Sequence, residues 1–154
     1  MKSILFVCLG NICRSPTARA LFAARLEKAG LAVETDSAGV ADYHVGKAPD
    51  PRSVRHADRW GVDISAERAR QVQQQDFQRF DAIFAMDRSN LAELERMAPA
   101  NSKARLALLM DLAPEYGLDE VPDPYYGGPD GFERVLDMLS AAADALVDEL
   151  SKPS

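Results

Sequence analysis

The sequence predicts an α/β protein, a single domain over residues 1–154 with helices on both faces of a parallel sheet. Short apolar runs alternate with segments of helical periodicity, which is the pattern of parallel strands joined by covering helices. A chain of 154 residues suffices for one such domain, and no repeat or linker divides it. Because ligands of parallel sheets bind beyond the carboxyl ends of the strands, the loops that follow the strands are the candidate site.

Four short apolar runs, bounded by turn-forming or polar residues, are the candidate strands. They are Ser3–Cys8, Val33–Ser37, Ala82–Met86 and Leu106–Leu109. The first run ends directly in a turn that contains glycine and asparagine, and a helical pattern follows it. The sequence therefore predicts a four-stranded sheet that opens with a strand–loop–helix unit.

The helices are predicted from their start and stop signals and from their apolar period. The first is expected to begin at Pro16, with Ser15 as its N-cap, and to end at Gly30. Asp130 and Glu133 resemble a capping box at the start of the last helix, whose apolar residues keep a 3.6-residue period. Further helices are expected over about 52–60 and 89–97.

The overall charge excludes one class of partner. A formal net charge of −6 argues against nucleic-acid binding, which usually requires a basic face. Residues 1–77 carry a net charge of +2 and residues 78–154 one of −8, so an anion site is easier to place in the first half.

No apolar run approaches the ~20 residues that span a bilayer, and the N-terminal run is too short for a signal peptide. We therefore expect a cytoplasmic protein that binds no nucleic acid and does not insert into membranes.

The two cysteines, Cys8 and Cys13, are better interpreted as reactive thiols than as a structural disulfide. A disulfide that closes so short a loop adds little stability, and a cytoplasmic setting disfavours it. His44 and His56 are the only histidines, and their spacing does not fit a zinc site. No metal or other cofactor is predicted.

The segment that begins at Cys8 has the composition of a phosphate-binding loop between a strand and a helix. Such a loop can turn its backbone N–H groups inward, with the helix N-terminus behind them. Gly10 and Asn11 tolerate the left-handed backbone that a tight loop requires, and the planar fork of Arg14 can bond two phosphate oxygens. The predicted phosphate-binding residues are Leu9, Gly10, Asn11, Ile12, Cys13, Arg14 and Ser15.

Cys8 is the candidate nucleophile of this loop. The donors that would bind phosphate also favour the thiolate, which is the reactive form, and Ser15 can hydrogen-bond the sulfur and help it leave an intermediate. A phenolic leaving group needs an acid, and Asp123 is the best supplier because the following proline restricts it to extended backbone. Tyr125 and Tyr126 come next and would provide aromatic walls for a flat substrate ring.

Taken together, these motifs resemble the low-molecular-weight protein tyrosine phosphatases over essentially the whole chain. The matching segments are Val7–Pro16, Asp36–Gly39, Ala69–Gln71 and Asp123–Tyr126. The resemblance implies that Cys8 is the nucleophile, Arg14 the phosphate-binding cation and Asp123 the general acid and then the base. It also implies a four-stranded parallel sheet, no metal, and phosphotyrosine-containing proteins as partners, with a tyrosine kinase among the candidates. The protein would act as a monomer or weak oligomer.

The resemblance further implies how the loop is supported and where the chain departs from its relatives. Asn11 would hold a strained conformation, helped by hydrogen bonds from residues such as Ser37, with Ser15 also supporting the loop. Many relatives carry Trp where Tyr43 stands on the cleft-lining loop. Many also carry, at the position of Glu67, a His that braces the loop through Asn11, so Glu67 puts this bracing in question.

Three other functions are alternatives to phosphotyrosine hydrolysis. A thioredoxin-coupled arsenate reductase needs two further cysteines, but no cysteine follows Cys13. Phosphoarginine phosphatases resemble this loop but carry Thr at the position of Ile12; the isoleucine and the Tyr125–Tyr126 pair in the cleft favour phosphotyrosine. A non-catalytic phosphotyrosine-binding module is disfavoured by the intact Cys8, Arg14 and Asp123.

Hydrolysis does not itself require Cys13, so two roles for this residue stay open. It could pack beneath the loop as a small apolar side chain. Alternatively, it could be a redox partner that traps oxidised Cys8 as a reversible Cys8–Cys13 disulfide before irreversible acids form.

Overall fold

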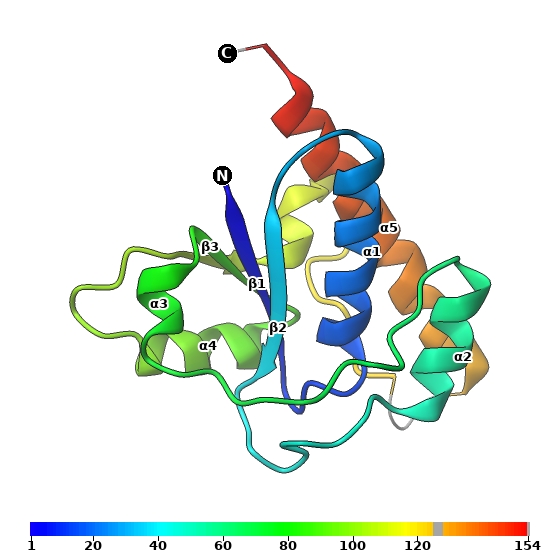
Figure 1. Ribbon diagram of the computed structural model, residues 1–154, viewed down its shortest axis with the longest axis horizontal. Helices are drawn as coiled ribbons and strands as arrows, with labels where there is room; N and C mark the ends of the chain where they lie inside the picture. Colours follow the sequence, from blue (N-terminus) through cyan, green and yellow to red (C-terminus); the bar gives the residue numbers. More distant parts are fainter. Residues whose placement is uncertain (125–127, 154) are drawn as a thin grey trace.

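A parallel sheet of four strands forms the centre of the protein, as a computed structural model of residues 1–124 and 128–153 shows (Figure 1). The strand order is β2-β1-β3-β4, and every neighbouring pair is parallel. The strands are β1 (Ser3–Cys8), β2 (Glu34–Gly39), β3 (Ala82–Ala85) and β4 (Arg105–Leu108). The predicted sheet is thus confirmed, with strand ends displaced by one or two residues.

Helices cover both faces of the sheet, which confirms the predicted fold class. They are α1 (Arg14–Lys28), α2 (Pro51–Arg59), α3 (Asp76–Arg79), α4 (Arg88–Met97) and α5 (Pro129–Ser151), with the 3₁₀ helices η1 (Leu109–Leu112) and η2 (Pro114–Tyr116). In Figure 1, α1, α2 and α5 lie on the right of the sheet and α3 and α4 on the left. The loops after β1 and β2 lie together at its lower end.

Two apolar layers fix the sheet because the side chains of β1 alternate between its faces. Ile4 and Phe6 pack in the layer beneath α1 and α5, whereas Leu5 and Val7 pack in the layer beneath α4. All four side chains are fully buried, and burial of each is worth about 1.5–3 kcal/mol. The carboxyl end of β1 is therefore anchored from both sides, and the loop that follows it starts from a rigid point.

The first helix begins two residues earlier than predicted, and Ser15 is not its N-cap. Cys13 occupies the N-cap position without a side-chain capping bond. The Ser15 hydroxyl instead lies 3.0 Å from the Cys8 sulfur and accepts a hydrogen bond from Asn11 at 2.7 Å. The Ser15 side chain therefore makes tertiary contacts in the loop before α1 instead of capping the helix, as its local sequence had indicated.

The predicted capping box of the last helix is also wrong. Gly128 is the N-cap of α5 and has no side chain to offer. Glu133 instead accepts a hydrogen bond from the indole of Trp60 at 3.2 Å, and its other oxygen lies 2.5 Å from His56 Nδ1. These contacts tie α5 to the end of α2.

Within the described ranges, no helix combines the length and apolar character needed to cross a membrane.

Candidate active site

The loop between β1 and α1 is held against the end of β2. The N–H groups of Val40 and Ala41 each donate to a carbonyl of this loop, those of Cys8 and Leu9, at 3.0 Å. A Cβ at Gly39 would lie only 2.8 Å from the Leu9 carbonyl oxygen, so no side chain fits between the two segments. The start of the loop is therefore fixed in position against the end of β2.

The Cys8 sulfur is buried at the base of the loop and faces hydrogen-bond donors. The sulfur accepts the backbone N–H of Asn11 at 3.3 Å and lies 3.0 Å from the Ser15 hydroxyl. Cys8 is 3% exposed, so these groups replace most of the water that would otherwise solvate it. Donors arranged in this way stabilise a negative sulfur, which is the nucleophilic form.

Asn11 holds the turn of the loop in a left-handed conformation, with φ of 60°. It is the one non-glycine residue with positive φ in the part of the chain that the structure describes. Its side-chain amide donates to the hydroxyls of Ser15 and Ser37 at 2.7 and 2.9 Å, and its oxygen accepts the backbone N–H of Arg70 at 3.0 Å. The loop-support residues that the sequence predicted, Ser15 and Ser37, thus meet at Asn11.

Gly10 serves the loop in a different way from the one predicted. It does not have positive φ, unlike Asn11. A Cβ at Gly10 would lie 2.7 Å from Cδ2 of His44, so a larger residue here would displace the imidazole ring that packs against the loop. The spacing of His44 in the sequence bears only on a metal site and gives no indication of this contact.

Arg14 is the first residue of α1, and its side chain is buried. Its Nη1 donates to Asp87 at 2.6 Å and to the Val121 carbonyl at 3.0 Å, and its Nη2 lies 3.8 Å from Asp123. Burial alone would lower the pKa of Arg14, but the Cys8 sulfur and the carboxylates of Asp87 and Asp123 raise it. The guanidinium is therefore a permanent charge whose orientation is fixed.

Asp87 is the residue of this network that the sequence did not single out. It is the N-cap of α4, because its second carboxyl oxygen accepts the N–H of Asn90 at 2.8 Å. One carboxylate thus anchors both the helix and Arg14. Its place shortly after β3, at the same sheet edge as Cys8, was a usable signal.

A cleft of about 350 Å³ opens above the loop. Its lining residues are Cys8, Leu9, Gly10, Ile12, Cys13, Arg14, Tyr43, His44 and Asp123. Tyr43 is 72% exposed and stands at the rim, edge-on to His44. The predicted cleft residues Ile12 and Tyr43 therefore share one site with the predicted catalytic groups, whereas Tyr125 and Tyr126 lie outside the described residues.

Cys13 is buried, and both cysteines are free thiols. Burial raises the pKa of Cys13 to about 12, although a hydrogen bond with Ser53 acts in the opposite direction. The residue also lines a small void with His56 and Phe132. Its burial is compatible with the packing role, and its redox role stays a prediction.

Glu67 does not take part in bracing Asn11. Its carboxylate bonds Arg19 of α1 at 2.8 Å, while the Asn11 oxygen is occupied by the Arg70 N–H. Burial raises the pKa of Glu67, opposed by Arg19 and assisted by the nearby Asp36. The bracing of Asn11 therefore does not depend on the side chain at position 67, because the backbone N–H of Arg70 bonds the Asn11 oxygen.

Comparison with known proteins identifies the group to which this arrangement belongs. Residues 3–154 match the family model described as low molecular weight phosphotyrosine protein phosphatase. A low molecular weight protein-tyrosine-phosphatase of Streptomyces coelicolor is 47% identical, with 94% of this chain and 90% of that protein covered.

Two solved structures are similarly close in fold. A protein tyrosine phosphatase of Entamoeba histolytica has a TM-score of 0.92 and 39% identity, with 97% of each chain covered. A structure described as the Drosophila arginine phosphatase has a TM-score of 0.93 and 32% identity, with both chains fully covered.

Proposed function

The chain belongs to the low molecular weight phosphotyrosine protein phosphatases, and we propose that it hydrolyses phosphotyrosine in proteins through a phosphocysteine formed on Cys8. The observation that carries this proposal is the position of the Cys8 sulfur at the base of a cleft that Arg14 and Asp123 also line. A sulfur nucleophile, a fixed cation and a carboxyl group at one site are the groups that transfer of a phosphoryl group to sulfur requires.

In the first step, the Cys8 thiolate attacks phosphorus and the bond between phosphorus and the phenolic oxygen breaks. Arg14 and backbone N–H groups of the loop would bind the phosphoryl oxygens as charge develops on them. Asp123, in its protonated form, gives its proton to the departing phenolic oxygen. The products are neutral tyrosine and a phosphorylated Cys8.

In the second step, water attacks the phosphocysteine and the phosphorus–sulfur bond breaks. The Asp123 carboxylate accepts a proton from that water and so regains its starting form. The sulfur leaves as a thiolate, which the Ser15 hydroxyl and the Asn11 N–H stabilise from 3.0 and 3.3 Å. Inorganic phosphate then departs.

We expect a phosphotyrosine peptide to be hydrolysed much faster than phosphoserine or phosphoarginine peptides of the same sequence. An aryl phosphate would place its flat ring between Ile12 and Tyr43, which both line the cleft, and phenol is a better leaving group than the aliphatic hydroxyl of serine. The measurement is kcat/KM for the three peptides.

The variant Ile12→Thr provides the matched control for substrate choice. If Ile12 favours the aryl substrate, this variant should gain activity toward phosphoarginine relative to phosphotyrosine. Preferential hydrolysis of phosphoarginine by the unaltered protein would overturn the assignment and place the chain with the arginine phosphatase that it also resembles in fold.

A second part of the proposal concerns Cys13 as the redox partner of Cys8. Peroxide would convert the Cys8 thiolate to a sulfenic acid with loss of hydroxide, and attack by the Cys13 thiol would form a disulfide and release water. Because the pKa of Cys13 is raised to about 12, trapping would depend on its closeness in the loop rather than on ionisation.

We expect peroxide-treated protein to regain nearly full activity with dithiothreitol, whereas Cys13→Ser loses activity progressively and permanently. The measurement is activity after timed exposure to peroxide, followed by reductant. Equal recovery in both proteins would assign Cys13 to packing alone.

The proposal also covers the setting in which the enzyme works. Since catalysis needs Cys8 in its reduced form, a reducing compartment such as the cytoplasm suits it. Phosphotyrosine-containing proteins, with a tyrosine kinase among the candidates, would be its substrates. A monomer or weak oligomer would leave the cleft open to such partners.

A further inference from the structure

We propose that Arg70 is a positioning residue of the active site, because its side chain fixes the two segments that hold Asn11 against the Cys8 sulfur. The proposal rests on the proposed function, since it concerns the same reaction. Arg70 lies on the segment between α2 and α3 and does not line the cleft. Its influence would pass through the loop and not through contact with substrate.

The main chain of Arg70 is built into the end of the sheet. Its carbonyl accepts the Gly39 N–H at 2.8 Å, and the Val72 N–H donates to the Gly39 carbonyl at 2.9 Å. This segment therefore continues the sheet beyond β2. The Arg70 N–H is left pointing at the Asn11 side chain, to which it donates at 3.0 Å.

The side chain of Arg70 joins two carboxylates from different elements, one on β2 and one on α3. It bonds both oxygens of Asp76, at 3.0 and 3.1 Å, and one oxygen of Asp36 at 3.1 Å. Burial by itself would lower the pKa of Arg70, but Asp76 and Asp36 together raise it. The planar fork of arginine permits this double engagement, which the single ammonium of lysine cannot reproduce.

Asp36 completes a closed ring of interactions around Asn11. Its other carboxyl oxygen accepts the N–H of Ser37 at 2.8 Å, and the Ser37 hydroxyl accepts the Asn11 amide at 2.9 Å. The bond from Arg70 N–H to Asn11 closes the ring. Ser37 accepts the hydrogen bond of the Asn11 amide, and the Arg70 N–H donates to the Asn11 oxygen. The ion pair between Arg70 and Asp36 thus links both partners of the Asn11 side chain.

The ring matters for chemistry because Asn11 is held in a conformation that few non-glycine residues adopt. Such a conformation persists only where the surroundings over-determine it. From that conformation Asn11 directs its N–H at the Cys8 sulfur and its amide at Ser15, which also faces the sulfur. A looser ring would weaken both contacts with the nucleophile.

The two ion pairs of Arg70 have different weights in stability. Asp76 is 3% exposed, so the loss of its partner Arg70 would leave a buried charge uncompensated. The Asp36 pair is partly exposed and lies near the Arg19–Glu67 pair, so it contributes little to the stability of the fold. Weakening it should therefore change the active site more than the fold.

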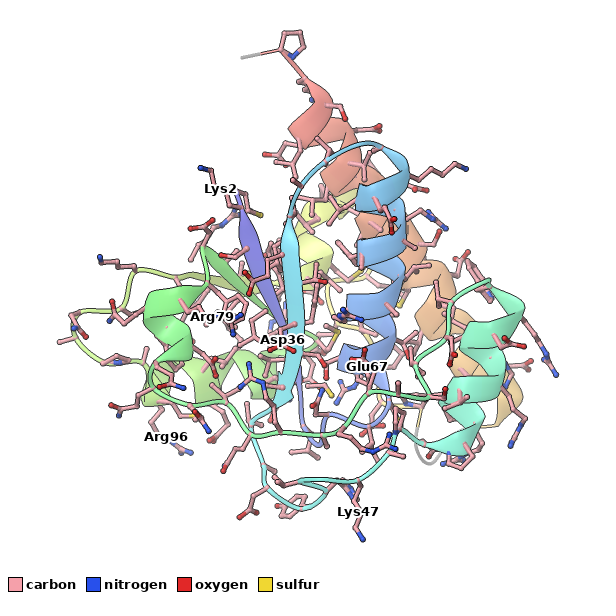
Figure 2. The ribbon with its side chains drawn as sticks, viewed as in Figure 1. Lys2, Asp36, Lys47, Glu67, Arg79 and Arg96 are labelled. Carbon is pink, nitrogen blue, oxygen red and sulfur yellow. The ribbon has the colours of Figure 1, made fainter. Side chains whose placement is uncertain are left out.

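The test uses Asp36→Asn, which keeps the oxygen that binds Ser37 but loses the charge that binds Arg70. Glu34→Gln is its matched control, because Glu34 also lies on β2 and pairs with Arg79 of α3. Asp36 and Arg79 are labelled in Figure 2. Arg70→Lys is a second variant, which keeps a cation for the buried Asp76 but cannot bond both carboxylates. Urea unfolding establishes that each variant is folded.

Two measurements follow: kcat/KM for p-nitrophenyl phosphate, and the pH dependence of Cys8 alkylation by iodoacetamide. We expect Asp36→Asn and Arg70→Lys to lose roughly 10-fold in kcat/KM, which is less than the 10²-fold that a 1 Å misplacement can cost. We also expect alkylation to move to higher pH, because the thiolate loses part of its support. Glu34→Gln should match the unaltered protein in both measurements.

The outcomes separate this proposal from the proposed function. An unaltered protein without phosphatase activity would remove the function on which the proposal rests. An active unaltered protein, together with Asp36→Asn and Arg70→Lys variants that match Glu34→Gln in both measurements, would show that Arg70 only stabilises the fold. Equal losses in all three variants would likewise overturn the proposal, because the effect would not be specific to the ring.

Discussion

Replacing the nucleophile, Cys8→Ser, is expected to abolish turnover while leaving the fold intact. The hydroxyl of serine has nearly the shape of the thiol, and its neighbours Ser15 and Asn11 can bond it as they bond sulfur. It does not ionise near neutral pH, however, so the attack on phosphorus loses its nucleophile. A loss on the order of 10⁶-fold in kcat follows by analogy with removal of the nucleophile of a serine protease. The measurement is release of p-nitrophenol under single-turnover conditions.

Two controls make this result specific to the sulfur of Cys8. Vanadate or phosphate should still bind the variant, because Arg14 and the loop N–H groups are unchanged. Cys13→Ser, tested under reducing conditions, removes the other thiol of the same loop and should leave turnover largely unaffected. Substantial turnover by Cys8→Ser would mean that another group attacks phosphorus.

The fold could be predicted because its signals are local and mutually consistent. The β1 run Ile4–Val7 is continuously apolar, and it is buried from both faces in the structure. This is the pattern of a central parallel strand. The short helix α3 was not predicted, since a helix of four residues offers too little sequence for a periodic pattern.

The central part of the site could be predicted because Cys8, Asn11 and Arg14 lie in one short segment. A loop between a strand and a helix brings such residues together without long-range information. Asp123 was found from its own local context, the proline that follows it. The structure brings it to within 3.8 Å of Arg14 through the long loop after β4.

The supporting residues could not be predicted from local patterns. Asp87, Arg70 and His44 reach the loop from three segments that are distant in sequence, and each has an ordinary local role. Asp87 looks like a helix cap, and it is one, but its second oxygen also holds Arg14. The errors at Ser15 and Gly10 have the same origin, since tertiary contacts decided their roles.

The general acid is tested by Asp123→Asn, for which we expect a loss that depends on the leaving group. Phenol resembles the tyrosine side chain, whose pKa is near 10, and departs poorly unless it receives a proton. For phenyl phosphate kcat/KM should fall by about 10²–10⁴-fold, the usual contribution of general acid catalysis. For p-nitrophenyl phosphate the fall should be much smaller, because the activated phenolate needs little protonation as it departs.

The same variant should also expose the second step of the reaction. Without the Asp123 carboxylate, no base accepts the proton of the attacking water, so the phosphocysteine should accumulate on Cys8. With p-nitrophenyl phosphate this predicts a burst of about one equivalent of p-nitrophenol per enzyme, followed by slow turnover. Asp119→Asn is the matched control, because Asp119 lies on the same loop and pairs with the exposed Arg88. It should show neither the leaving-group dependence nor the burst. A loss in Asp123→Asn that is equal across leaving groups would mean that another carboxylate supplies the proton.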